Sequence, residues 1–162
     1  MQPALNDESL TIYVGTMTGT ADIVAEEVRD WLRAQGVTVE IRSMVDLGAE
    51  AFRPGRGYLI CTSTYGQGDV PDNARDFHAA LERARPDLRG VSFGLIGLGD
   101  STYRETFCFG GKRFETLLTG LGATLVGEPL YHDAAEGTLP EEEAVTWVAT
   151  WFPALAPLKS AA

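Results

Sequence analysis

Short apolar runs alternate with amphipathic stretches from one end of the chain to the other. The runs at 10–14, 58–62 and 91–98 are almost entirely apolar. Continuous apolar runs of this length are typical of strands buried on both faces, as in a parallel sheet that is covered by helices. We therefore expect these three runs to form the centre of a sheet.

Two further runs have the character of outer strands. Apolar and polar residues alternate along 37–41, which favours a strand with only one covered face. The last run, near 123–132, contains Pro129, whose nitrogen cannot donate to a strand ladder, so this run fits an edge or a bulge. We expect both runs at the outside of the sheet.

Apolar residues at helical spacing fill the intervals between the runs and predict four long helices, each with one face on the sheet. The alternation of strands and helices predicts an α/β fold with a doubly wound parallel sheet and helices on both faces. Only the tail after Pro153 is expected to fray. The predicted core-facing residues are Val24, Val28, Trp31 and Leu32 in the first helix, Phe77, Leu81 and Ala84 in the second, Phe114, Leu117, Leu118 and Leu121 in the third, and Val145, Val148, Ala149 and Phe152 in the fourth.

The bulk composition is that of one globular domain over 1–162. Of the 162 residues 44% are hydrophobic, and no apolar stretch approaches the roughly 18 residues of a membrane span. Residues 1–10 carry Asp7 and Glu8 where a signal peptide would need a basic start, so we expect a cytoplasmic protein. The net charge of −10 repels nucleic acid and anionic membranes and favours partners with basic faces.

The cysteines and histidines give no sign of a disulfide or a metal site. Cys61 and Cys108 are far apart in the chain, and neither belongs to a Cys-x-x-Cys pair. His78 and His132 form no cluster with them. We expect both cysteines to act as small buried apolar residues.

The segment after the first strand has the chemistry of a phosphate-binding loop. It runs through residues 15–21 as Gly-Thr-Met-Thr-Gly-Thr-Ala and enters a helix around Asp22. Amide groups at a helix start are unpaired, and three threonine hydroxyls add neutral donors. A plain threonine-capped helix entry remains the alternative. The loop lacks the residues of a triphosphatase loop or a dinucleotide fingerprint, and it lacks the acidic residues of a response-regulator receiver.

Two more loops follow the third and fourth strands, and each presents a tyrosine between small residues. Tyr65 lies in the turn-rich segment 63–73, and Tyr103 lies in the glycine-led segment 99–103. Ligands of doubly wound sheets bind at the carboxyl ends of the strands. The two rings could therefore enclose a flat aromatic ring system beside the phosphate loop.

Three motifs in this order resemble those of the flavodoxins. Residues 16–21 are similar to the family's phosphate loop, residues 63–69 to its second flavin loop and residues 97–103 to its third. The likeness covers nearly the whole chain and is strongest to the short-chain kind related to the MioC proteins and to the FMN domains of diflavin reductases. It implies a five-stranded parallel sheet in the order 2-1-3-4-5, with FMN as the cofactor.

The resemblance also implies the FMN contacts. Thr16, Thr18, Gly19 and Thr20 would hold the phosphate, Tyr65 and Tyr103 would cover opposite faces of the flavin, and the peptide of Gly66 would turn to accept a hydrogen bond from reduced flavin. Three residues at 104–106 stand between Tyr103 and Phe107, where many relatives have two. This departure concerns the roles of Phe107 and Cys108 as FMN contacts. The full set of implied contacts is Thr16, Met17, Thr18, Gly19, Thr20, Ala21, Ser63, Thr64, Tyr65, Gly66, Gly68, Leu98, Gly99, Asp100, Tyr103, Phe107, Cys108 and Asp133.

The function that the resemblance implies is electron carriage by a monomer that is not itself an enzyme. An NAD(P)H-dependent flavin reductase would be the donor, and a haem or iron–sulfur redox enzyme would be the acceptor. We therefore expect no segment that binds NADPH, and no Arg or Lys cluster that offers a pocket for its extra phosphate. The acids Asp69, Asp72, Asp100, Glu105, Asp133 and Glu136 are expected to rim the flavin edge and to steer basic partners.

Two alternatives belong to other functional classes. An FMN-dependent NAD(P)H oxidoreductase would need a substrate pocket over the flavin, which the expected tyrosine on each flavin face disfavours. A non-redox interaction module that has lost FMN would lack one of the three loops, and all three are present.

Overall fold

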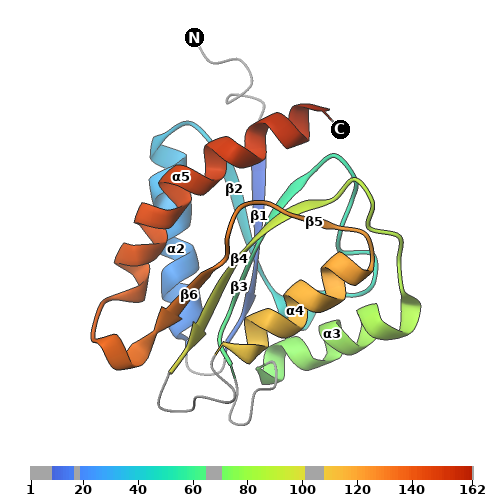
Figure 1. Ribbon diagram of the computed structural model, residues 1–162, viewed down its shortest axis with the longest axis horizontal. Helices are drawn as coiled ribbons and strands as arrows, with labels where there is room; N and C mark the ends of the chain where they lie inside the picture. The colour runs from blue at the N-terminus through green and yellow to red at the C-terminus, as the bar shows by residue number, and fades with distance from the viewer. Residues whose placement is uncertain (1–8, 17–18, 65–70, 101–107, 162) are drawn as a thin grey trace.

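The structure is a computed structural model that describes residues 9–16, 19–64, 71–100 and 108–161 (Figure 1). A parallel sheet with the order β2-β1-β3-β4-β5 forms its centre, and β6 pairs with β4. This arrangement confirms the predicted flavodoxin-like doubly wound fold. The strands are β1 (Ser9–Gly15), β2 (Thr38–Ser43), β3 (Gly57–Thr62), β4 (Ser92–Gly99), β5 (Thr124–Leu125) and β6 (Leu130–Asp133).

The burial of the strands follows their apolar pattern. Every residue of β3 is buried, and so is every residue of β4 except Gly99. Exposed and covered residues alternate at the start of β2, which lies at one edge of the sheet as expected. The three apolar runs therefore form the central strands, as predicted.

The outer strand expected near 123–132 is interrupted, which corrects the sequence-based expectation of one continuous strand. β5 pairs with the beginning of β4, and β6 pairs with its end. Between them, Gly127 adopts a φ of 67° and Pro129 has no amide hydrogen to donate. The fifth position of the sheet is therefore filled by two short strands.

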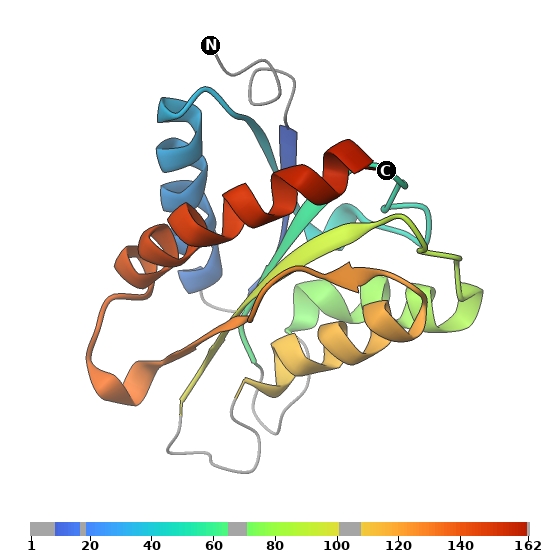
Figure 2. The same cartoon turned by 45° about the horizontal axis from the view of Figure 1, so that its top comes forward.

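Four helices cover the sheet in two layers. Figures 1 and 2 show α2 and α5 on one face and α3 and α4 on the other. Each layer closes a separate apolar core, one formed with α2 and α5 and one with α3 and α4. The helices are α2 (Thr20–Ala34), α3 (Asp72–Ala84), α4 (Phe109–Gly120) and α5 (Pro140–Ala161), and two short 3-10 turns are η1 (Met44–Asp46) and η3 (Ala134–Glu136).

The helices differ from their predicted forms in three details. α2 begins at Thr20 rather than around Asp22. Two predicted core residues, Ala84 and Ala149, are exposed. The expectation of a frayed tail after Pro153 is wrong, because α5 continues to Ala161 and buries Leu155 against the sheet.

Trp151 fixes α5 on the centre of the sheet. Its indole is only 3% exposed, stacks on Trp147 at 5.0 Å between ring centroids, and donates a hydrogen bond from Nε1 to the carbonyl of Val126 at 3.0 Å. The ring lies over Gly94 of β4, where any Cβ atom would overlap it. A glycine within a central strand thus creates the space that a helix tryptophan fills.

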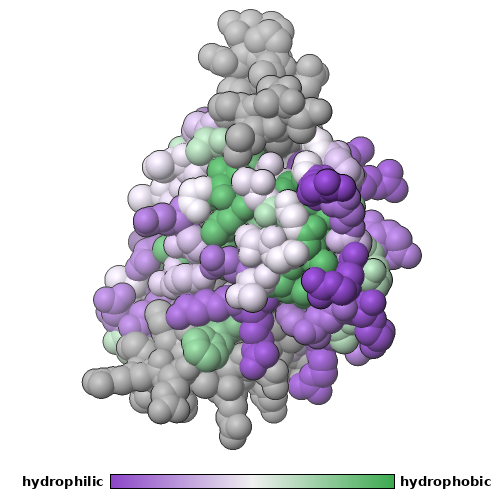
Figure 3. All heavy atoms as spheres, turned by 45° about the vertical axis from the view of Figure 1, so that its right-hand side comes forward, coloured by the Kyte–Doolittle hydropathy of each residue, from purple (hydrophilic) through white to green (hydrophobic). Residues whose placement is uncertain are grey.

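Hydrophilic side chains cover much of the face in Figure 3, with smaller apolar areas between them. None of the helices in the described part of the chain is long and apolar enough to cross a bilayer.

Candidate functional site

The carboxyl ends of β1, β3 and β4 meet at one edge of the sheet. The register aligns Gly15 with Thr62 and Thr62 with Gly97, so the three strands end at nearly the same level. The segments that follow these strands therefore start side by side. This is the edge at which open α/β sheets bind their ligands.

The first turn of α2 begins after a glycine. Gly19 is the N-cap residue, with a φ of 95° that glycine adopts without steric cost, and it has no side chain to cap the helix. The first bond within the helix runs from the amide of Ile23 to the carbonyl of Gly19. The amides of the residues between them have no partner within the helix. Thr18, the nearest residue that could cap them, lies outside the described residues, so both the phosphate loop and the threonine-capped entry stay predictions.

Thr16 holds the loop that leads to this helix. Its hydroxyl accepts a hydrogen bond from the amide of Gly19 at 2.9 Å, and its own amide donates to Oδ1 of Asn73 at 2.7 Å. The Nδ2 group of Asn73 in turn donates to the carbonyl of Val14 and to the hydroxyl of Ser43. Asn73 on α3 therefore joins the ends of β1 and β2. Sequence reasoning missed this role, because a single asparagine after a turn gives no signal for it.

Thr64 joins the segments that follow β3 and β4. Its hydroxyl donates to the carbonyl of Leu98 at 3.1 Å and accepts from the amide of Gly110 at 3.0 Å. Gly110 approaches so closely that a Cβ atom there would overlap the carbonyl oxygen of Ser63. The start of α4 is thus packed directly against the backbone that follows β3.

Ser63 carries a buried polar atom without a partner. Its amide donates to the carbonyl of Gly15 at 3.0 Å, which ties β3 to β1. Its hydroxyl oxygen is buried and has no hydrogen-bond partner among the residues that the structure describes. Buried polar groups are nearly always paired, so a partnerless hydroxyl at the ligand edge of the sheet is typical of a binding site.

Cys108 packs against Gly99 at the end of β4. It is fully buried with a φ of 55°, and its thiol lies 3.6 Å from the carbonyl of Gly97 and 3.8 Å from that of His132. Burial raises the pKa of this thiol to about 12, so it stays protonated at neutral pH. Its burial without a disulfide confirms the expectation for this residue, and Cys61 is likewise free and buried.

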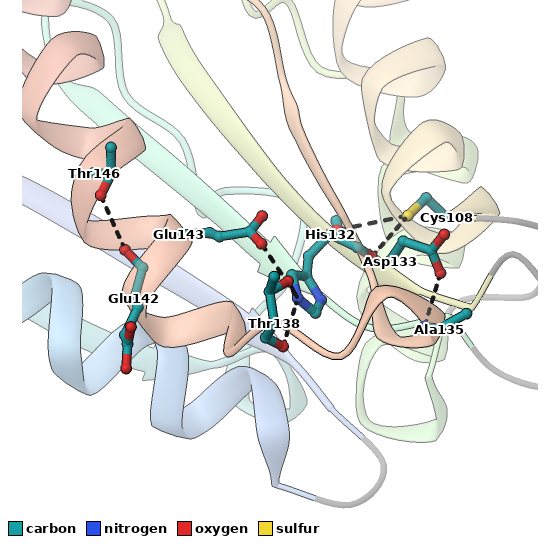
Figure 4. A network of polar contacts seen from close by, with 9 residues as sticks. Cys108, His132, Asp133, Ala135, Thr138, Glu142, Glu143 and Thr146 are labelled. Atoms are coloured by element: carbon teal, nitrogen blue, oxygen red, sulfur yellow. Dashed lines mark hydrogen bonds and ion pairs between the residues drawn. The ribbon is translucent and has the colours of Figure 1, made fainter.

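Asp133 ends β6 beside Cys108 (Figure 4). Its carboxylate accepts a hydrogen bond from the amide of Ala135 at 2.9 Å and so caps the turn η3. His132 points the other way, with Nε2 3.0 Å from the hydroxyl of Thr138. Asp133 is therefore held at the ligand edge of the sheet.

The structure brings many of the predicted contact residues to this edge. Thr16, Gly19, Thr20, Ala21, Ser63, Thr64, Leu98, Gly99, Asp100, Cys108 and Asp133 lie on the ends of the strands or on the first turns that follow them. Met17, Thr18, Tyr65, Gly66, Gly68, Tyr103 and Phe107 lie outside the described residues. The enclosure of a ring by Tyr65 and Tyr103 therefore stays a prediction.

Three basic residues line one cavity between α3 and α4. Arg85, Lys112 and Arg113 belong to the lining of this cavity, whose volume is about 570 Å³. Arg85 is 27 positions from Lys112 in the sequence, so only the packing of the two helices brings it to the same cavity as Lys112 and Arg113. The expectation that no Arg or Lys cluster offers a pocket for the extra phosphate of NADPH stays a prediction.

The doubly wound sheet presents the start of α2 and the buried hydroxyl of Ser63 at its ligand edge, an arrangement that suits a phosphate-bearing ligand. The chain belongs to the flavodoxin family, whose sequence profile matches residues 12–147. It is 40% identical to Flavodoxin YqcA of Escherichia coli over 143 residues, or 86% of this chain and 93% of the relative. It is 35% identical to Protein MioC of the same organism over 145 residues, or 88% and 95%.

Solved structures place the chain in the same family. A flavodoxin from Pseudomonas aeruginosa superposes with a TM-score of 0.79 at 34% identity, over 91% of this chain and 97% of that one. The NADPH sulfite reductase flavoprotein alpha-component of Vibrio parahaemolyticus is 40% identical over 116 residues, which are 71% of this chain and 18% of the relative. The predicted resemblance to short-chain flavodoxins is thus confirmed. The chain is an electron-transfer flavoprotein, and its cofactor is FMN.

Proposed function

We propose that this chain is a cytoplasmic, monomeric, single-domain electron carrier over 1–162 and not an enzyme. It takes electrons from an NAD(P)H-dependent flavin reductase and passes them to a haem or iron–sulfur redox enzyme. When bound, FMN supplies the redox chemistry, because its ring system accepts and releases electrons one at a time. The observation that carries the proposal is the start of α2 at the ligand edge of the sheet, where Gly19 opens the helix and leaves its first amides without partners in the helix.

The residues at this edge fit FMN. The free amides at the start of α2 and the hydroxyl of Thr20 suit a phosphate monoester, and the helix dipole favours its negative charge. The partnerless hydroxyl of Ser63 offers a hydrogen bond to a polar group of the same ligand. We propose as FMN contacts the set of residues that the resemblance implies, of which Thr16 is the first in the sequence and Asp133 the last.

The contacts around Thr64 and Asn73 keep this edge in one arrangement. Thr64 ties the segments after β3 and β4 to α4, and Asn73 ties the first loop to α3. A site held by several elements loses little entropy when its ligand binds, so it binds more tightly than a loose one. We propose that Asn73 positions the FMN contacts without touching FMN itself, and that Thr64 both contacts FMN and holds its neighbours in place.

Acidic groups at the edge give the carrier its partner preference. Asp100 follows β4, Asp133 precedes η3 and Glu136 is its last residue, all in a chain whose net charge is −10. Negative charge near the flavin disfavours additional negative charge on it, and the same acids attract basic patches of a reductase or an acceptor. Partner association should therefore weaken strongly as salt is added.

The phosphate contacts can be tested with a double substitution in the first loop. Replacing Thr18 and Thr20 with alanine should weaken FMN binding by about 1 to 3 kcal/mol, as expected for lost hydrogen bonds to a charged group. Riboflavin lacks the phosphate, so the two substitutions should weaken its binding much less. Titration of flavin fluorescence measures both affinities, and equal losses would place the phosphate elsewhere.

The stacking role of Tyr103 predicts a change in redox behaviour. Replacing Tyr103 with alanine admits water to the flavin and removes an electron-rich ring that disfavours negative charge on it. The second one-electron potential should become more positive by tens of millivolts, where about 59 mV corresponds to a tenfold change. A redox titration measures the shift, and unchanged potentials with unchanged FMN affinity would show that Tyr103 does not stack on the flavin.

Electron carriage can be tested by comparing the protein alone with the protein plus a separate NADPH-dependent reductase. The FMN-loaded protein should not oxidise NADPH alone, but it should reduce cytochrome c when a flavodoxin reductase and NADPH are added. The likeness to only 18% of the sulfite reductase flavoprotein supports this division of labour between two modules. NADPH oxidation by the purified protein alone would instead favour the FMN-dependent oxidoreductase.

A further inference from the structure

A groove with apolar walls lies between β6 and the beginning of α5. Leu130, Leu139 and Trp147 form its apolar lining, and its volume is about 470 Å³. Asp133, the last residue of β6, pairs with Gly99 at the end of β4. The turn that leads from β6 to α5 therefore starts at the ligand edge of the sheet, at the lower left of Figure 1.

Leu139 belongs to a turn whose backbone is fixed on both sides. Its side chain is 52% exposed, and its carbonyl accepts hydrogen bonds from the amides of Glu142 and Glu143, both at 3.2 Å. The carbonyl and the hydroxyl of the preceding Thr138 lie 3.1 and 3.0 Å from Nε2 of His132 (Figure 4). The exposure of this leucine is therefore built into the fold.

Trp147 gives the groove a rigid aromatic wall. Its ring stacks on Trp151 at 5.0 Å between centroids, and its Nε1 group donates to the carbonyl of Glu128 at 3.0 Å. A side chain held in this way loses little freedom when a partner binds, and tryptophan is among the residues that contribute most to interfaces. The groove thus offers a preformed apolar surface to a partner.

The charge around the groove selects the kind of partner. Segment 136–143 contains four glutamates and no Lys or Arg, and Glu142 and Glu143 line the groove. Oε2 of Glu143 lies 3.9 Å from Nε2 of His132, whereas Glu142 is exposed and no described residue pairs with its carboxylate. Acids at a helix start also favour the helix dipole, but that role does not require an exposed leucine beside them. A second copy of this acidic chain would be repelled, and a basic partner would be attracted.

We propose that this groove seats a basic redox partner of the carrier. An apolar side chain of the partner lies between Leu139 and Trp147, and a neighbouring Lys or Arg side chain lies on Glu142. The inference rests on the proposed function, because it names the surface on which an electron donor or acceptor docks. The apolar contact is insensitive to salt, whereas the contact with Glu142 is screened by it.

Stopped-flow kinetics can separate the two contacts. The FMN-loaded protein is reduced chemically and mixed with cytochrome c, a basic haem protein. Leu139→Ser should lower the second-order rate constant roughly threefold to tenfold at low and high salt alike, because it removes apolar contact area. Glu142→Gln should lower it about twofold to fivefold at low salt, and this difference should disappear at high salt.

Matched variants separate the groove from general effects of charge and polarity. Val45→Ser on η1 and Glu40→Gln on β2 make similar changes at the opposite edge of the sheet and should leave the rate constant nearly unchanged. Leu139→Met keeps an apolar side chain and should retain the rate. Equal losses in Leu139→Ser and Val45→Ser, or in Glu142→Gln and Glu40→Gln, would overturn the proposal.

Backbone NMR of the oxidised, FMN-loaded protein detects docking without electron transfer. Addition of cytochrome c should shift resonances at 130 and at 138–147. If these shifts occur but the reduced protein does not reduce cytochrome c, the proposed function fails while the docking surface stands. If electron transfer occurs without shifts in the groove, or if the shifts reflect association of the chain with itself, the docking surface is wrong and electron carriage stands.

Discussion

Replacing Trp151 with alanine should lower the free energy of unfolding by about 3 to 5 kcal/mol, the usual cost of removing a buried tryptophan. The ring fills the space over Gly94, stacks on Trp147 and satisfies the carbonyl of Val126, so its loss leaves a cavity between α5 and the sheet. Chemical denaturation of the FMN-loaded protein measures the change. FMN affinity should be nearly unaffected, because the tryptophan is remote from the ends of the strands.

The close contact between Trp151 and Gly94 also predicts that substitutions at the two positions are energetically coupled. Gly94→Ala alone should cost about 1 to 3 kcal/mol, because its Cβ atom overlaps the indole ring. In the Trp151→Ala background the same change enters vacated space and should cost almost nothing. A double-mutant cycle measures this coupling. Additive costs would show that the glycine is not required by the tryptophan.

Gly110→Ala should weaken FMN binding by about 1 to 3 kcal/mol, or roughly tenfold to a hundredfold. The added Cβ atom overlaps the carbonyl of Ser63 and displaces the backbone that carries Ser63 and Thr64. The hydrogen bond from Gly110 to Thr64 should be lost with it. Fluorescence titration measures the FMN affinity. The free energy of unfolding without FMN shows how much of the lost affinity comes from a general loss of stability.

Gly120→Ala provides the matched control on the same helix. A Cβ atom at Gly120 meets nothing within 4 Å, so alanine there should leave FMN affinity unchanged and raise stability by a few tenths of a kcal/mol. An unchanged FMN affinity in Gly110→Ala would show that the approach of α4 does not shape the site.

The central strands could be predicted from the sequence because their signal is local. A continuous apolar run at 58–62 is stable only where both faces are covered, and every residue of β3 is indeed buried. The edge position of β2 follows in the same way from its alternation of polar and apolar residues. The first loop gave a less specific signal, since threonines before a helix fit a plain helix cap as well as a phosphate site.

The broken fifth strand and the length of α5 depended on contacts that no local pattern encodes. Pro129 indicated an irregular strand, but the pairing of β5 and β6 with opposite ends of β4 is a property of the whole sheet. The composition after Pro153 indicated fraying, yet the burial of Leu155 holds the helix together. In both cases packing energy overrides a weak local preference.

The sequence by itself determined the fold class, the three segments at the ends of the strands and the family, because each rests on residues close together in the chain. Only the tertiary structure decided how those segments are held, through Asn73 on one helix and Gly110 on another. It alone brought Arg85 of one helix end and Arg113 of another helix to the lining of one cavity. Such groupings arise from packing between distant segments, and charges or hydroxyls that converge in this way leave no periodic trace in the sequence.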